Sequence, residues 1–568
     1  MKKILLTFII ISGLLFLNSC EKQLEYVPTG ILSSADLSSP TAVEGLVTAA
    51  YSAIGNGDMI GPIYSMWAYG SVRSDDSYKG GGGTGDVFEV DALEHYNTVQ
   101  PTFGAFISKS WQNLFKSVSR ANVALRAVNT LSEADFPQKK TRLAELRFLR
   151  AHSYFTMKIL YKNIPVFDEN ASSEDILKVS NDLSWEDSWN KIAADFQYAV
   201  DNLPVTQSET GRPNKYAAQT YLAKTRLYQA YTQNATHQVT GISNARLQEV
   251  VTLLQAVIAS GRYSLSPDIA NNFLPETENG PESIFAIQFT INDGTTASRL
   301  NYEDGLNYPH GAPQYGCCGF HAASQNLVNA HTTDANGLPL FTTFNNGIAN
   351  LNTATVDVRI DHTVGIDGHV YKYDNTKLFS NSWVRDPGVY GFFHTMRNQQ
   401  LASSPSYFKN GPFMGVAKNY DILRYDDVLL MLAEAYIELG QQANALPLIN
   451  QIRARAAAST GKLRKMDGTF ASNYNIKQYP STGWTQSYAR TALQWERRLE
   501  FATEGSRFFD LVRWGMAAQT LNGYVAVEKI RRPFLATAVF TAGRDEYLPI
   551  PQSEITFTNG LYKQNPGY

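Results

Sequence analysis

Apolar residues recur every three or four positions through most of the chain, the spacing of one face of an α-helix. Behind Ser184 these positions are Trp185, Trp189, Ile192, Phe196, Ala199 and Leu203, and Pro204 ends the run. The Ser184 hydroxyl can cap the first N–H groups, with Asp187 completing a capping-box-like start. A second helix is expected from about Pro213, a residue suited to a first turn. Its predicted face carries Ala217, Tyr221, Lys224 and Tyr228.

A repeat signal lies further along the chain. Its positions are Leu429, Leu432, Ala433, Tyr436, Gly440, Ala445, Ile449 and Ile452, which match a tetratricopeptide unit. The small Ala433 and Ala445 allow two helices to approach, and Gly440 permits the turn between them. One unit cannot bury its own apolar face, so other helix pairs must stack beside it, and the segments 103–162 and 184–260 are the candidates.

The stretch from about 265 to 420 has a different character. It is rich in Gly, Asn, Pro and Tyr, and has only short β-like runs such as 283–290. We therefore predict a mainly α protein: a tetratricopeptide-like α-α superhelix over 41–264 and 421–568, with a large irregular loop-rich insertion containing short β segments at 265–420. Irregular loops held by rigid elements are where binding surfaces usually lie.

The first residues have the features of an export signal. Lys2 and Lys3 precede an apolar run over 4–16, and Ser19 stands directly before Cys20. The run is shorter than the roughly 20 residues that a membrane-spanning helix needs. We expect a signal peptide at 1–19, a lipid on Cys20 and a flexible tether over 20–40. A plain signal peptide with an incidental cysteine is the alternative.

The charge balance bears on possible partners. The chain has 49 basic and 52 acidic residues and no basic stripe, so nucleic acid is not expected as a partner. Aromatic residues make up 12% of the chain, including 31 Tyr, and such rings can stack on sugars and peptides, although many will be core.

Familiar catalytic motifs are missing. The run 80–85 formally satisfies G-x-G-x-x-G, but no apolar strand precedes it and 86–90 opens no obvious helix, so we predict no dinucleotide cofactor. No metallopeptidase, Walker or nucleophile-elbow motif occurs. His362 and His369 lie near Asp361 and Asp367, and we interpret these histidines as solvated hydrogen-bonding groups. We assign no catalytic residue, no metal and no cofactor.

Two pairs of neighbouring residues have several interpretations. Asp75 and Asp76 could bind sugar hydroxyls or cap a structural element, while a glycosidase acid and nucleophile rarely come from adjacent residues. Cys317 and Cys318 are adjacent in an oxidising compartment. They form either a strained disulfide that would rigidify its turn or two buried thiols.

Three segments together resemble the SusD family: 494–515 (QWERRLEFATEGSRFFDLVRWG), 547–552 (YLPIPQ) and 564–568 (QNPGY). The Ser74-Asp-Asp76 segment and the repeat at 425–457 also occur in the family's order. Within the first segment, the charged residues at helical steps are expected to pair along one helix: Glu496, Arg497, Glu500, Glu504 and Arg507.

The resemblance implies a function and a site. Such a protein captures a glycan at the outer membrane, to which lipid anchors it, and delivers the glycan to a SusC-like TonB-dependent transporter. The implied ligand stretches are about 67–96, with Trp67, Arg73, Asp75, Asp76 and Tyr78, and about 302–321, with Tyr302, Tyr308, Tyr315, Cys317, Cys318, Phe320 and His321. Many relatives have a Trp in the second stretch where Cys317 and Cys318 stand here; if bonded, the two sulfurs could themselves offer an apolar face to a sugar.

Other functions are compatible with the same chain. Peptides use similar aromatic and polar surfaces, so a peptide-binding protein of the same architecture is the first alternative. A surface glycoside hydrolase and a structural tetratricopeptide adaptor are weaker alternatives.

Overall fold

A computed structural model describes residues 39–568 except 56–57, 100–103, 292 and 295–298. The predicted signal peptide, Cys20 and nearly all of the predicted tether lie outside the described residues.

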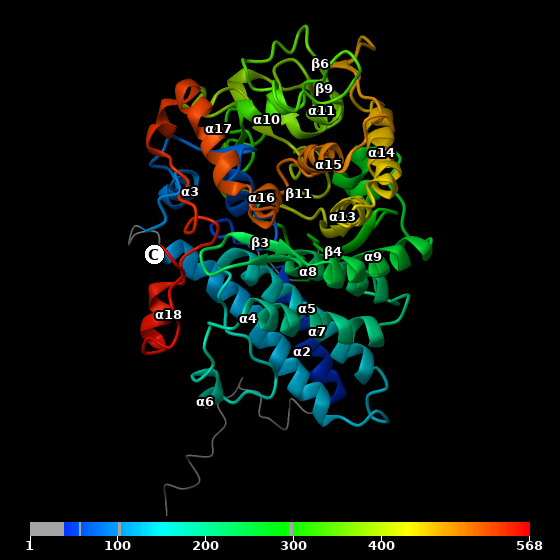
Figure 1. Cartoon of the computed structure of the whole chain (residues 1–568), viewed down its shortest axis with the longest axis vertical. Coiled ribbons are helices and arrows are strands. Elements are labelled where there is room, and N and C mark those ends of the chain that lie inside the picture. The colour runs from blue at the N-terminus through cyan, green and yellow to red at the C-terminus, as the bar shows by residue number, and fades with distance from the viewer. Residues whose placement is uncertain (1–38, 56–57, 100–103, 292, 295–298) are drawn as a thin grey trace, which may run out of the picture.

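The protein is mainly helical, with its long helices packed side by side in a row (Figure 1). The first part of the row consists of α2 (Pro40–Ile54), α4 (Gly104–Thr130), α5 (Lys139–Tyr161), α7 (Trp185–Asn202), α8 (Lys215–Ala230) and α9 (Asn244–Ala259). The row continues from α9 to α13 (Tyr425–Glu438), which packs on α14 (Gln442–Ala458) and α15 (Gln486–Glu500). The predicted tetratricopeptide-like superhelix is confirmed, because α13 stacks on α9 although some 165 residues separate them.

Local chemistry explains where several of these helices begin and end. Ser184 caps α7, accepting a hydrogen bond from the Asp187 N–H at 3.0 Å. The start expected at Pro213 is wrong by two residues, because Asn214 caps α8 by accepting from the N–H groups of Tyr216 and Ala217. Gly440 has a φ of +75° between α13 and α14, a conformation that favours glycine.

The insertion leaves the helical row and returns to it through one pair of strands. Strand β4 (Ser283–Ile287) pairs antiparallel with β13 (Tyr420–Arg424), and α13 follows directly. Between them lie β5 (Phe320–Ala323), α10 (Gln325–Ala330), β6 (Thr355–Val356), α11 (Arg359–Thr363), β7 (Val364–Gly365), β8 (Val370–Tyr371), β9 (Asp374–Leu378), η6 (Asn381–Trp383), α12 (Pro387–Tyr390), β10 (His394–Thr395), β11 (Tyr407–Asn410) and β12 (Phe413–Val416). The short helices η4 (Ile269–Phe273) and η5 (Pro275–Thr277) precede β4.

Shorter elements complete the chain. Near the N-terminal end these are η2 (Trp67–Val72), β1 (Ser77–Gly80), α3 (Phe88–Glu94), α6 (Ser173–Ile176), β2 (Tyr231–Gln233) and β3 (Val239–Ile242). Near the C-terminal end they are β14 (Asn473–Tyr474), α16 (Arg507–Arg513), α17 (Ala517–Arg531), η7 (Pro533–Thr537) and α18 (Gln552–Phe557).

The sequence suggested that the charged residues of 494–515 pair along one helix, and this prediction is wrong. Helix α15 ends at Glu500, Thr503 and Gly505 take positive φ angles, and α16 begins at Arg507. The side chains instead reach other elements. Arg359 on α11 binds Glu496 at 2.8 Å and Glu500 at 3.1 Å, so these ion pairs join the insertion to the superhelix.

Within the part of the chain that the structure describes, none of the helices combines the length and the apolar content required to cross a bilayer.

Candidate functional site

Strand pairing brings the two predicted ligand stretches together. Strand β1 pairs antiparallel with β5, with Tyr78 opposite Ala322 and Gly80 opposite Phe320. The Gly81 N–H then donates to the Gly319 carbonyl at 2.8 Å, which extends the contact into the glycine run. The stretches 67–96 and 302–321 are therefore neighbours in space.

The glycine run at 80–85 is a tight loop between β1 and α3. Gly80, Gly81 and Gly83 take φ angles of +74°, +79° and +89°. A Cβ at Gly81 would lie 2.7 Å from the Phe320 ring, so only glycine fits there. A strand precedes this loop and a helix follows it, contrary to the sequence expectation. However, β1 is in a two-stranded antiparallel sheet, which does not match the parallel βαβ unit of a dinucleotide site.

Lys79 closes this loop from inside the protein. Its buried ammonium donates to the carbonyls of Gly83 at 2.8 Å and Asp86 at 2.5 Å. Burial lowers the pKa of Lys79, and the carboxylates of Glu94, Asp91 and Asp86 partly oppose that effect. The Gly82 N–H also donates to the Asp86 carboxylate at 2.9 Å. These contacts hold the loop in one shape.

Cys317 and Cys318 form a disulfide directly beside the glycine loop. Cys318 is buried at 4% exposure, whereas Cys317 is half-buried. Arg385 links the two segments, because it donates to the Cys318 carbonyl at 2.9 Å and pairs with Asp86 at 2.8 Å. The interpretation of these residues as two buried thiols is thus wrong for this structure.

A groove of about 630 Å³ lies on the other side of the glycine loop. Thr84, α3 and the segment after α17 line it, and His95 at the end of α3 contacts the Phe534 carbonyl at 2.7 Å although the two residues are far apart in the sequence. Phe88 is 46% exposed at the groove. Burial alone would lower the pKa of His95, but hydrogen bonds to Asp91 and to the Phe534 carbonyl raise it to about 9, so this side chain is cationic at neutral pH.

We call the combined surface the glycine-loop face: residues 80–86, the Cys317–Cys318 disulfide, Arg385 and the groove. It offers an apolar ring at Phe88, a disulfide, several charged or polar groups and a backbone without side chains at the glycines. Such a mixture of apolar surface and hydrogen-bonding groups suits a polyhydroxylated ligand.

Most side chains predicted to touch ligand are instead buried. The buried ones are Trp67, Arg73, Asp75, Asp76, Tyr78, Tyr308, Tyr315, Cys318, Phe320 and His321. Tyr302 and Cys317 are half-buried. The indole of Trp67 donates to the Glu303 carbonyl at 2.9 Å, and the Tyr308 and Tyr315 rings lie 4.8 Å apart in a small core. In this structure the buried side chains support the glycine-loop face from below and do not form its surface.

Asp75 and Asp76 join the segment before β1 to α15 and α16 through ion pairs. Arg507 binds Asp75 at 2.9 Å and Arg498 binds Asp76 at 3.1 Å. Burial alone would raise the pKa of Asp75, but Arg498 and Arg507 lower it to about 2. Burial raises the pKa of Asp76, with Arg498 opposing it and Asp75 adding to it. Buried carboxylates tied to arginines cannot reach a glycosidic bond, so the glycosidase interpretation of this pair is wrong.

The groups that complete the glycine-loop face carry little sequence signal. Asp86 follows the glycine run, but Arg385 and Arg544 lie in irregular segments and Phe534 lies in the short helix η7, so none of the three belongs to a periodic pattern. Their positions depend on contacts across the whole chain. His362 and His369 are hydrogen-bonded, but the expectation that they are solvated is wrong for His362, which is buried and contacts the Ser459 carbonyl at 2.8 Å. His369 is half-buried and pairs with Asp361 at 2.7 Å.

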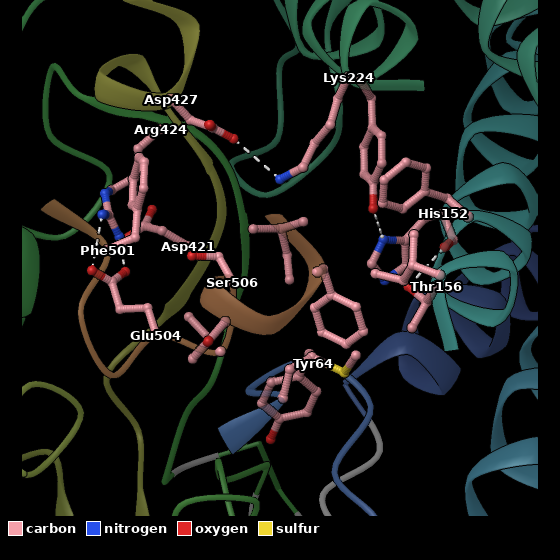
Figure 2. A pocket seen from close by; sticks show the side chains of 18 of the residues that line it. Tyr64, His152, Thr156, Lys224, Asp421, Arg424, Asp427, Phe501, Glu504 and Ser506 are labelled. Carbon is pink, nitrogen blue, oxygen red and sulfur yellow. Dashed lines mark hydrogen bonds and ion pairs between the residues drawn. The ribbon is translucent and has the colours of Figure 1, made fainter. Parts of the chain in front are cut away.

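A small pocket of about 140 Å³ lies between α5, α8 and the region around α13 (Figure 2). Lys224 pairs with Asp427 at 3.1 Å on one side, and His152 contacts the Tyr221 hydroxyl at 2.7 Å on the other. Burial, with Lys224 adding to it, lowers the pKa of His152 to about 4. Both polar and apolar side chains line this pocket. Its charged groups are paired with one another, so we assign it a structural role.

The fold and sequence have known relatives. A family model described as SusD family matches residues 281–568, and one described as "Starch-binding associating with outer membrane" matches residues 77–227. SusD-like protein P2 of Formosa agariphila is 25% identical over 576 residues, covering 100% of both chains.

Solved structures share the architecture. A SusD superfamily protein from Bacteroides vulgatus has a TM-score of 0.70 at 22% identity, covering 93% of this chain and 99% of that chain. Surface glycan-binding protein A from Bacteroides thetaiotaomicron, in complex with laminarihexaose, has a TM-score of 0.60 at 19% identity, covering 92% of this chain and 99% of that chain. Since the first family model spans just over half of the chain, the chain belongs to the SusD family.

Proposed function

We propose that this protein captures a glycan on its glycine-loop face at the bacterial surface, without cleaving it, and delivers it to a SusC-like TonB-dependent transporter. In this proposal lipid on Cys20 anchors the chain to the outer membrane. The observation that carries the proposal is that the β1–β5 pairing brings the glycine loop beside the disulfide segment, with the groove next to the same loop at Thr84.

The chemistry of the face supports a sugar ligand. Glycine residues allow a chain of sugars to approach the backbone closely. The half-exposed Phe88 ring can stack on the apolar side of a pyranose, and Arg385 can donate hydrogen bonds to hydroxyl groups. A structural relative has been solved in complex with laminarihexaose, which supports a glucan among the ligands to be tested.

A panel of polysaccharides tests the proposal. Residues 21–568 are run through native gels that contain laminarin, other neutral glucans, charged polysaccharides or no polymer. We expect retardation by at least one polysaccharide, and Phe88→Ala should weaken that binding by roughly 3- to 10-fold, as the loss of one stacked ring implies. Phe557→Ala is the matched control, because Phe557 is 68% exposed on α18 and does not line the groove.

Two outcomes would contradict the proposal. Retardation by no polysaccharide, with binding of peptides instead, would favour the peptide-binding alternative. Release of reducing ends over many turnovers would show that the protein is a hydrolase.

The anchor and the transporter need separate measurements. Mass spectrometry of the membrane-extracted protein should show a diacylglyceryl-type mass on Cys20, and Cys20→Ala should release the protein from the membrane fraction. Crosslinking in intact cells should recover a large outer-membrane β-barrel protein. A Cys20 without lipid would contradict the anchoring part of the proposal.

A further inference from the structure

The Cys317–Cys318 disulfide lies at the surface end of an aromatic cluster. Behind it, Tyr308, Tyr315 and Tyr371 are buried, and Trp383 and Tyr407 pack against them at the edge. The Tyr315 ring lies 5.7 Å from the Tyr407 ring and 6.4 Å from the Tyr371 ring. The sulfurs are therefore the outer part of a continuous apolar body that reaches the surface.

The segment that carries the disulfide is held on several sides. The Gly319 N–H donates to the Tyr308 carbonyl at 2.8 Å, and Lys409 donates to the Tyr315 carbonyl at 2.7 Å. Arg385 holds the Cys318 carbonyl at 2.9 Å. Because its backbone is fixed before any ligand arrives, this segment would lose little conformational freedom on binding.

The exposed part of this segment has the right mixture of groups for a sugar. Cys317 is half-buried, so part of the disulfide reaches the surface, and the neighbouring Gly316 has no side chain that could cover it. A disulfide is polarizable, apolar and without hydrogen-bond donors. Hydrogen-bond donors lie near the disulfide, because Arg385 and Lys409 bind carbonyl groups of the same segment.

We propose that the Cys317–Cys318 disulfide is itself the apolar platform on which one pyranose ring of the glycan rests. The C–H face of the ring lies on the two sulfurs, and Arg385 and Lys409 donate to its hydroxyl groups. Arg385 is already paired with Asp86, whose carboxylate would repel a sulfate or a uronate beside it, so the arginine side of the platform suits an uncharged sugar better than a sulfated or uronic one. This inference rests on the proposed function and identifies one subsite of the same face.

The cysteine content of the chain allows a clean test. The sequence has three cysteines, so residues 21–568 retain only Cys317 and Cys318. A phosphine reductant attacks the S–S bond and supplies two electrons; one water then gives its oxygen to the phosphine, which becomes the oxide, and its two protons to the two thiols. No other disulfide can form within this protein, so any effect of the reductant on binding comes from this pair.

Titration calorimetry measures the affinity for a neutral polysaccharide that retards the protein in the gels. Three forms of the protein are compared: the oxidised wild type, the reduced wild type and the double variant Cys317→Ser/Cys318→Ser. We expect the reduced protein and the double variant to bind roughly 3- to 10-fold more weakly than the oxidised protein. The double variant should not respond to the reductant, which controls for other effects of the phosphine. Circular dichroism and thermal melting check that each state is folded.

Three results would overturn the platform. Equal affinity in all three states would remove it while leaving the proposed function intact, because binding itself would persist. Two free thiols in the protein isolated without reductant would also remove it. Absence of binding to any polysaccharide in the oxidised state would overturn the platform together with the proposed function. If the double variant does not fold, the reduced wild type gives the answer with an unchanged sequence.

Discussion

Two buried carboxyl groups near the glycine loop have pKa values shifted in opposite directions. Arg498 and Arg507 outweigh the burial of Asp75 and lower its pKa to about 2. Glu94 is also buried, but His95 and Lys79 only partly offset its burial, and its pKa rises to about 8. Asp75 is thus ionised and forms ion pairs within the fold, whereas Glu94 is mostly protonated at neutral pH.

The Glu94 carboxyl predicts a pH dependence of stability. Its pKa is raised from 4.5 to about 8 in the folded protein, so the folded state holds this proton more tightly than the unfolded state. The contribution of Glu94 to the free energy of unfolding is fully present below about pH 4.5 and is lost as the pH rises towards 8. Glu94→Gln should therefore gain stability relative to wild type over this range, by up to roughly 4 kcal/mol.

Urea unfolding at a series of pH values between 4 and 9 measures this difference. Glu174→Gln is the control, because Glu174 is exposed on α6 and should show no such trend. A difference between Glu94→Gln and wild type that does not change with pH would contradict the raised pKa.

Residue identity alone did not reveal which aromatic side chains face solvent. Trp67, Tyr78 and Phe320 lie in the predicted stretches, but η2 and the β1–β5 pair turn them inward. Phe88, in the first stretch, is the exposed ring at the groove. A short strand buried on both faces has no alternating pattern that could separate the two cases.

At the scale of elements, helix periodicity and turn residues were the informative signals. The repeat over α13 and α14 was predicted with Gly440 at the turn, and Gly440 has a φ of +75° with open space around the position of a Cβ. A substitution there would test backbone conformation alone, because the added methyl group meets no neighbour.

Gly440→Ala should destabilise the protein by about 1 kcal/mol, because an L-residue is strained at a positive φ. Gly45→Ala is the matched control: Gly45 lies within α2, also with open space around a Cβ, and alanine is the better helix former. That control should be stabilising by about 0.5–1 kcal/mol. Chemical denaturation of both variants measures the difference, and equal effects of the same sign would contradict the argument.

The 494–515 segment shows the limit of periodicity at this scale. Its charged residues are spaced as on one helix, but Thr503 and Gly505 turn the chain between α15 and α16. Gly70 packs against the Gly505 backbone so closely that a Cβ at Gly70 would overlap it. The break between α15 and α16 is therefore accompanied by a contact with η2, which lies more than 400 residues earlier in the chain. The spacing of residues within 494–515 could not reveal such a contact.

At the scale of the whole molecule, buried ion pairs connect the insertion to the superhelix. Arg359 is fully buried and binds Asp357 at 2.8 Å within the insertion, Glu496 at 2.8 Å and Glu500 at 3.1 Å. Arg455 on α14 continues the set by binding Glu282 at 2.9 Å, just before β4. These pairs orient the loops that carry the glycine-loop face relative to the helical row.

Arg359→Ala should therefore destabilise the whole protein by roughly 3–5 kcal/mol, because it leaves buried carboxylates without their partner. Denaturant unfolding followed by tryptophan fluorescence measures the loss. Arg262→Ala, at an exposed arginine, should change stability by less than about 0.5 kcal/mol. A loss at Arg359 no larger than that of the control would mean that the network does not hold the two parts together.

The sequence by itself determined the fold class, the helix pairs of the superhelix and the family resemblance, because these depend on periodicity and on residues close together in the chain. It also pointed to the two stretches that meet at β1 and β5. Only the tertiary structure decided that Asp75, Trp67 and most other predicted ligand residues are buried. It likewise brought Arg385 into contact with both the glycine loop and the disulfide segment, since burial and contacts between distant segments depend on how the whole chain packs.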